Sequence, residues 1–117
     1  MDIAGIIASV LLALVAAASG VPKIAGAPRM RDEATHLGVP RTGYVLIGAL
    51  ELAAAVGLLA GLAHPPLGIA AAGGLVLMMT GAVLAHLRAS DRTAALAPAL
   101  AVGIIGAFTL VLRLATT

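Results

Sequence analysis

Four apolar stretches, each about as long as a bilayer is thick, constrain this chain more than any other feature. They cover residues 3–21, 43–63, 66–86 and 94–113, and each reaches the roughly 20 residues that a helix needs to cross a hydrocarbon core of about 30 Å. The chain is 62% hydrophobic and 10% charged, which is more apolar surface than a soluble domain of 117 residues needs. The stretches lack the alternation of barrel strands, so helices are the structure that satisfies their backbone in lipid. We predict one all-α domain over residues 1–117, a four-transmembrane-helix bundle in a lipid bilayer.

The first apolar stretch has one feature of a secretory signal, the small residues Ala16, Ala17 and Ala18. The segment before it, Met1-Asp2, carries no Lys or Arg, and three further spans follow. Both observations favour a first helix that is retained in the protein over a cleaved signal.

The positive charges predict an orientation. Six of the seven fall in the connections after the first and third stretches, and the seventh lies near the C-terminus: Lys23, Arg29, Arg31, Arg41, Arg88 and Arg92 against Arg113. By the positive-inside rule we expect both basic connections to be cytoplasmic and both termini to be outside. An Ala- and Gly-rich chain without cysteine or lipidation signals fits a bacterial inner membrane. No basic stripe is interleaved with aromatic residues, so we expect no nucleic-acid partner.

The connection over residues 22–42 is too long for a plain turn. Pro28 suits the first position of a helix, and Gly38 followed by Pro40 is a stop signal. We predict a short interfacial helix between the first and second spans. Its charged residues then face headgroups or water; in the alternative interpretation the helix is a lid over a cavity.

Small residues recur on all four predicted spans. They form repeats such as Gly57 and Gly61 on the second span and Gly73 and Gly81 on the third. Such residues let helix backbones approach closely in lipid. We therefore expect a compact bundle, and the same faces leave open a homodimer or a membrane protein partner.

Glu51 lies inside the second apolar stretch, where an ionised group costs roughly 2.5–3.5 kcal/mol and normally has a partner. Lys23 ends the first span and His86 ends the third on the side from which Glu51 enters its helix, on the order of 10 Å deep. We predict that these three groups converge into a site for proton exchange, the candidate catalytic set. Each also has a duller interpretation: Lys23 reaching the headgroups, His86 stabilising a helix end, and Glu51 as a hydrogen-bonded packing residue.

Small or flexible side chains share the faces of Glu51 and His86 and are candidate ligand-binding residues: Gly48, Ala55, Met79 and Ala82. The chain has no cysteine for thiol–disulfide or iron–sulfur chemistry, no phosphate-binding loop and no ligand spacing for a metal. His36 and His64 are interpreted as loop residues. Proton chemistry is what remains.

A series of short motifs resembles the DoxX-like family of membrane proteins. Their order is Ser19-Gly20-x-x-Lys23, Leu37-Gly38-x-Pro40, Gly48-x-x-Glu51-Leu52-x-x-x-x-Gly57 and Gly81-Ala82-x-x-x-His86-Leu87. The resemblance implies a four-helix integral membrane protein in which Lys23, Glu51 and His86 occupy recurrent polar positions, and its first motif adds Ser19 to the ligand-binding candidates. The family includes subunits associated with thiosulfate:quinone oxidoreduction and components linked to redox stress, while most members have no defined activity.

Four functions remain open at this point. The leading hypothesis is a protein that binds a quinone or another isoprenoid or lipophilic molecule, with quinone as the one candidate cofactor. The second is an enzyme that uses Glu51 as an acid in isomerisation, epoxide opening or cyclisation of a terpenoid or lipid. The third is an accessory subunit of a membrane complex. A proton-coupled exporter ranks last, because Glu51 is on the second span and aromatics that stack a cationic drug are missing.

Overall fold

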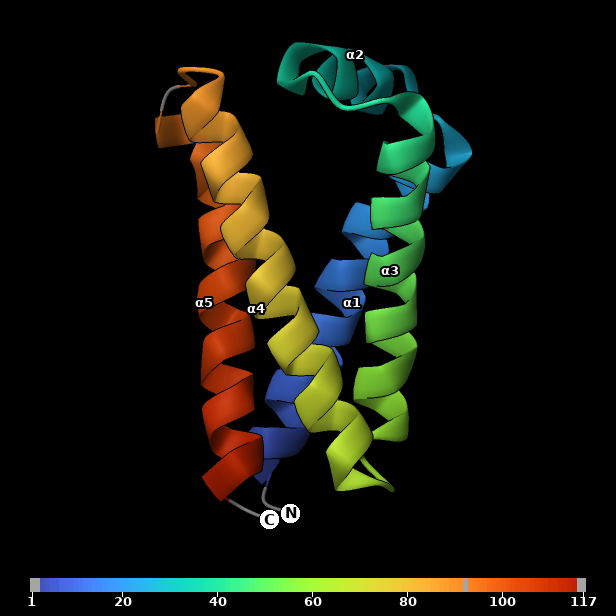
Figure 1. Ribbon diagram of the computed structural model, residues 1–117. Helices are drawn as coiled ribbons and strands as arrows, with labels where there is room; N and C mark the ends of the chain where they lie inside the picture. Colours follow the sequence, from blue (N-terminus) through green and yellow to red (C-terminus); the bar gives the residue numbers. More distant parts are fainter. Residues whose placement is uncertain (1–2, 92, 116–117) are drawn as a thin grey trace.

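The computed structural model describes residues 3–91 and 93–115, which form five α-helices (Figure 1). Four are long and one is short: α1 (Ile3–Ala25), α2 (Pro28–Leu37), α3 (Arg41–Ala60), α4 (Pro65–Arg88) and α5 (Thr93–Ala115). The all-α class and the short helix between the first two spans are thereby confirmed. The four long helices have the length and composition to cross a membrane.

The first span is longer than its apolar stretch predicts. Helix α1 continues through Pro22 to Ala25 and stops at Gly26, whose φ of 70° lies in the left-handed region. The amide of Ala27 then donates to the carbonyl of Pro22 at 3.1 Å. Proline removes a single amide donor, so the helix tolerates it near its end and stops only where glycine permits the left-handed turn.

Helix α2 has the limits that its sequence signals predict. Pro28 occupies its first turn and Gly38 follows it with φ 73°, while the amide of Val39 donates to the carbonyl of Ala34 at 2.9 Å. These contacts satisfy carbonyls that a helix end otherwise leaves without a donor. Pro40 then precedes α3.

The long helices are arranged as two pairs, α1 with α3 and α4 with α5 (Figure 1). The pairs meet in a core of small and branched residues: Leu12, Ala13, Ala16, Ala55, Leu58, Ala72 and Leu75. The ribbons of α3 and α4 diverge toward the end of the bundle where α2 lies, while the described ends of α1 and α5 lie together at the opposite end. Polar groups at the α2 end therefore do not all meet.

Small residues pack closely on α3 but not on every helix. A Cβ at Gly57 would lie 3.0 Å from the Cβ of Ala71, and one at Gly61 would lie 2.4 Å from the Cα of Gly68. These contacts hold α3 against α4 near their connecting turn. On α4, by contrast, a Cβ at Gly73 or Gly81 would meet nothing within 4 Å, so those glycines do not pack inside the bundle.

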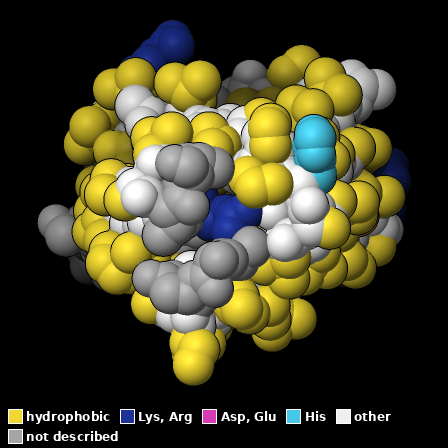
Figure 2. Space-filling model, turned by 90° about the horizontal axis from the view of Figure 1, so that it is seen from below, with side chains coloured by type: hydrophobic (Ala, Val, Ile, Leu, Met, Phe, Trp, Pro, Cys, Tyr) yellow, Lys and Arg dark blue, Asp and Glu magenta, His cyan; other side chains and the backbone are white. Residues whose placement is uncertain are grey.

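The two ends of the bundle differ in charge. The described cations at the α2 end are Lys23, Arg29, Arg31, Arg41 and Arg88, whereas Arg92 lies outside the described residues. The described surface of the opposite end consists mostly of hydrophobic side chains (Figure 2). Arg113, counted from sequence as a flanking charge, is only 2% exposed and donates a hydrogen bond to the carbonyl of Gly61 at 2.5 Å.

Candidate functional site

A buried ion pair joins α1 to α3. The ammonium of Lys23 lies 2.7 Å from Oε1 of Glu51, whose side chain is 1% exposed. Glu51 belongs to the buried stripe of α3, which repeats at helical spacing: Tyr44, Gly48, Glu51, Ala55 and Leu58. An acid in this position faces the bundle and not the lipid, and its partner comes from the neighbouring helix.

Two glycines bring the pair together. Gly20 lies three residues before Lys23, and Gly48 lies three residues before Glu51. A Cβ on either glycine would lie 2.7 Å from the carbonyl oxygen of the other, a distance that no real side chain keeps. The backbones of α1 and α3 can therefore touch here. The two helices are antiparallel (Figure 1), and each charged residue packs against the glycine of the other helix: the Cβ of Lys23 lies 2.8 Å from the position of a Cβ on Gly48, and the Cβ of Glu51 lies 3.1 Å from that of a Cβ on Gly20.

Lys23 also has contacts on its own helix and across the site. It donates to Oγ of Ser19 at 2.7 Å, and its nitrogen lies 5.6 Å from the centre of the Tyr44 ring. Both contacts attract an ammonium group, the second because the ring face is negative. Ser19, expected to contact a ligand, thus orients the lysine.

The second carboxylate oxygen of Glu51 differs from the first. Oε2 is buried, and no residue in the described part of the chain hydrogen-bonds to it. Leaving a buried acceptor unsatisfied costs about 1–3 kcal/mol, more when it is charged. This oxygen is therefore the atom of the pair that lacks a donor in the described chain.

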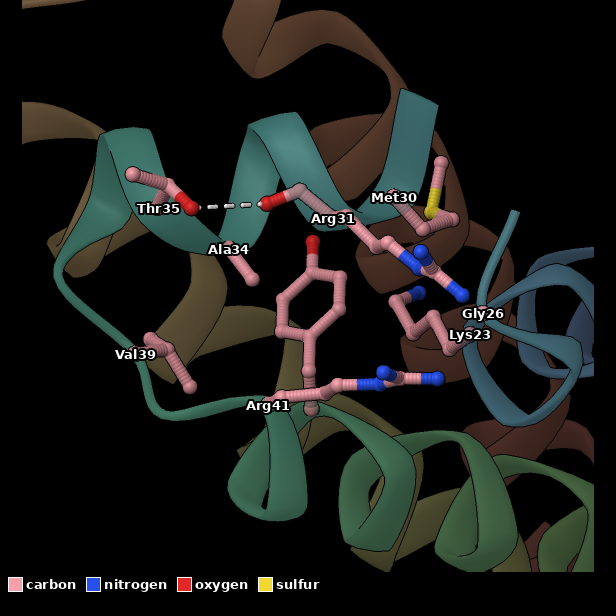
Figure 3. Close-up of a pocket in the computed structure, with 9 residues that line it drawn as sticks. Lys23, Gly26, Met30, Arg31, Ala34, Thr35, Val39 and Arg41 are labelled. Carbon is pink, nitrogen blue, oxygen red and sulfur yellow. Dashed lines mark hydrogen bonds between the residues drawn. The ribbon is translucent and has the colours of Figure 1, made fainter. Parts of the chain in front are cut away.

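A cavity of about 160 Å³ opens beside the pair, between the end of α1, α2 and the start of α3 (Figure 3). Lys23 and Tyr44 line it together with Gly26, Met30, Arg31, Ala34, Thr35, Val39 and Arg41. Glu51, which pairs with Lys23, does not itself line the cavity. Helix α2 therefore covers the Lys23 side of the site, in the position that the lid interpretation requires.

His86 belongs to a second polar cluster. The Nδ1 atom of His86 lies 2.5 Å from Oδ2 of Asp91, and its Nε2 atom lies 3.7 Å from Oε1 of Glu33. The other carboxylate oxygen of Asp91, Oδ1, lies 2.5 Å from Nε2 of His36. The cluster connects α2 to the end of α4 and the residues after it. The hydrogen bond from His86, followed by that from His36, lowers the pKa of the Asp91 carboxyl below its ordinary value.

The three predicted catalytic groups are thus divided between two clusters. The structure brings Lys23 and Glu51 together, while the ion pairs of His86 in the described chain are with Asp91 and Glu33. His36, interpreted from sequence as a loop residue, lies in the last turn of α2 and takes part in the second cluster.

The remaining ligand-binding candidates lie apart from the cavity. Gly48 is at the helix contact beside the pair, Ala55 belongs to the core, and Met79 is buried with its Cβ 3.4 Å from the position of a Cβ on Gly103 of α5. Ala82 is half-buried on α4. None of these four lines the described cavity over Lys23.

Sequence reasoning missed three residues that the structure places in one of the two polar clusters or at a buried position. Tyr44 lies seven residues before Glu51, hence on the same helix face, and that spacing was the available signal. Asp91 follows a helix end that carries a histidine, which is a weak signal. The burial of Arg113 had none, because a cation near a span end is normally exposed.

The chemistry available to the two clusters is proton transfer and hydrogen bonding. In the described residues no three His, Asp or Glu side chains are arranged to hold a metal ion. The Lys23 ammonium can donate to a ligand oxygen, and Oε2 of Glu51 can accept from a ligand hydroxyl.

Comparison with known proteins identifies one family. The family model described as the DoxX-like family matches residues 7–112. No curated protein and no solved structure matches the chain. The match includes most of each of the four long helices and both polar clusters.

Proposed function

The chain belongs to the DoxX-like family and is an integral membrane protein; from this membership and the Lys23–Glu51 pair we propose that it binds a quinone or another isoprenoid, lipophilic molecule. One observation carries the proposal. Oε2 of Glu51 is a buried acceptor without a hydrogen-bond donor in the described chain, next to a lysine that lines a cavity. A ligand hydroxyl supplies the missing donor.

The pair suits both forms of a quinone. A quinone carbonyl accepts hydrogen bonds and is matched by the Lys23 ammonium, whereas a quinol hydroxyl donates and is matched by Oε2 of Glu51. Because a salt bridge holds the two groups 2.7 Å apart, a proton added to the carboxylate weakens its hold on the ammonium. Ligand protonation and the state of the pair are thus linked, which is the basis of proton exchange at this site.

The size of the cavity limits which part of the ligand enters. Pockets for complete drug-sized ligands have volumes of roughly 300–1,000 Å³, and this one has about 160 Å³. The polar head therefore approaches Lys23, and the isoprenoid tail remains among the lipid chains outside the bundle.

Native mass spectrometry with lipid extraction tests the proposal on detergent-purified protein. Glu51→Gln removes the anionic acceptor and keeps the shape, and Asp32→Asn makes the same chemical change on the exposed surface of α2. We expect wild type and Asp32→Asn to retain a quinone or isoprenoid that Glu51→Gln has lost. If all three are equally folded and empty, the binding proposal fails and a role as an accessory subunit is the one to pursue.

We also propose that the protein lies in a bacterial inner membrane with the α2 end in the cytoplasm. The support is the cluster of described cations at that end, together with the burial of Arg113, which removes it from the count of loop charges. The chain has no cysteine, so single variants report cleanly. Asp32→Cys should be protected from an impermeant thiol reagent in intact cells, and Ala63→Cys in the opposite turn should be labelled; the reverse pattern would invert the orientation.

A further inference from the structure

We propose that Arg31 and Arg41 form a binding site for a phosphate group at the mouth of the cavity over Lys23. Both arginines line that cavity, one from α2 and the other from the start of α3. This site does not rest on the proposed function. The phosphate would bind the two arginines and not Lys23, whose charge is already matched by Glu51.

The two guanidinium groups converge on one point of the backbone. A Cβ at Gly26 would lie 3.0 Å from Nη2 of Arg41 and 3.4 Å from Nη2 of Arg31. Both side chains extend toward Gly26 and Lys23 from opposite sides of the cavity (Figure 3). Gly26, with its positive φ and no side chain, leaves the space into which both groups reach.

Neither guanidinium has an acid to neutralise it. In the described part of the chain no carboxylate lies within 4.0 Å of Arg31 or Arg41, and the ion pairs there belong to Lys23, His36 and His86. Two like charges held against the same glycine repel each other. An anion bound between the two guanidinium groups offsets that repulsion, so the pair of arginines favours anion binding.

Phosphate is the anion that fits this geometry. Each guanidinium is a planar fork that binds two oxygens at once, and a phosphate offers enough oxygens, arranged tetrahedrally, to serve two forks that approach from different directions. The site also lies where two membrane-spanning helices end and α2 begins, the depth at which lipid phosphates are found. A phospholipid headgroup and a free phosphate share this chemistry.

The experiment compares two charge-matched double variants in maltoside micelles free of phosphate. Arg31→Gln with Arg41→Gln removes the site, while Arg29→Gln with Arg88→Gln removes the same charge from arginines that lie at the same end and outside the cavity. Native mass spectrometry measures retention of phosphatidic acid against diacylglycerol, which lacks the phosphate. Titration calorimetry measures binding of inorganic phosphate.

We expect wild type and the double variant Arg29→Gln with Arg88→Gln to bind phosphatidic acid or inorganic phosphate at least tenfold more tightly than the double variant Arg31→Gln with Arg41→Gln. Diacylglycerol should show no such difference. Loss confined to phosphatidic acid identifies a lipid headgroup as the source, and loss of inorganic phosphate binding identifies a soluble one. Equal weakening in both double variants, or no binding by wild type, overturns the proposal.

Two further variants keep the outcome interpretable. Arg31→Lys with Arg41→Lys retains the charge and loses the forks, so it should bind between the two extremes even if the glutamine variant folds poorly. Glu51→Gln should keep its phosphate binding or increase it, because Lys23 then lacks its anionic partner. Loss of the lipophilic ligand alone in Glu51→Gln therefore separates the fate of the proposed function from that of the phosphate site.

Discussion

Gly20 and Gly48 touch through their backbones: a Cβ on either would lie 2.7 Å from the carbonyl oxygen of the other. The contact lies one helical turn before Lys23 on α1 and one turn before Glu51 on α3. The distance between the two helices, and with it the length of the ion pair, is thus determined by the absence of two side chains.

Gly48→Ala should separate the helices and weaken the pair. Its Cβ would also lie 2.8 Å from the Cβ of Lys23, so the backbone has to move, and inserting a methyl group into such a contact costs about 1–3 kcal/mol. Thermal unfolding in detergent measures the loss, and retention of the lipophilic ligand should fall with it.

Gly73→Ala on α4 is the matched control, since a Cβ there meets nothing within 4 Å. Alanine is the better helix former by roughly 0.5–1 kcal/mol, so this variant should be neutral or slightly stabilised. A Gly48→Ala protein as stable as Gly73→Ala would show that the close contact between α1 and α3 is not required.

The sequence predicts the helices well because their apolar lengths and their Gly and Pro signals are local. The depth of Lys23, Glu51 and His86 in the membrane stays a prediction, since it follows from the rise per residue alone. Depth does not determine which helices are neighbours. Because α3 and α4 diverge toward α2, His86 pairs with Asp91 and Glu33, and the cavity over Lys23 requires a helix whose docking no local pattern specifies.

Lys23→Met should destabilise the protein more than Lys23→Met combined with Glu51→Gln. The single change leaves the Glu51 carboxylate, 1% exposed, without its cation, and breaking a buried pair in this way costs about 3–5 kcal/mol. The double change removes both charges and restores part of the loss. Chemical denaturation of both variants and of Glu51→Gln completes the cycle; additive effects would mean that the two groups do not interact.

The cluster around Asp91 should make the docking of α2 depend on acid. The carboxyl has its pKa lowered in the folded protein by His86 and then His36, so its contribution to docking is complete above its ordinary pKa and is lost as the pH falls through the lower folded value. The facing groups are His86, His36 and Glu33. Hydrogen exchange of α2 should therefore stay slow at neutral pH and rise at strongly acidic pH.

Asp91→Asn should show faster exchange in α2 already at neutral pH, because the amide retains one acceptor oxygen where the carboxylate has two for the two histidines. Asp32→Asn, on the exposed side of the same helix, should exchange like wild type. Exchange in Asp91→Asn that matches wild type at every pH would exclude the cluster as the anchor of α2.

Arg113→Met should destabilise the end of the bundle opposite α2. The guanidinium is 2% exposed, donates to the carbonyl of Gly61 where α3 ends, and lies 3.5 Å from the position of a Cβ on Gly68. A cation at the C-terminal end of a helix also stabilises the helix dipole. Methionine keeps much of the length of the side chain but loses a charged hydrogen bond that contributes about 1.5–3 kcal/mol.

Arg88→Met is the control, since Arg88 is exposed at the α2 end, and it should change the midpoint of thermal unfolding little. If both variants unfold at the wild-type temperature, the Arg113 contact is not what holds α3 and α5 together at this end.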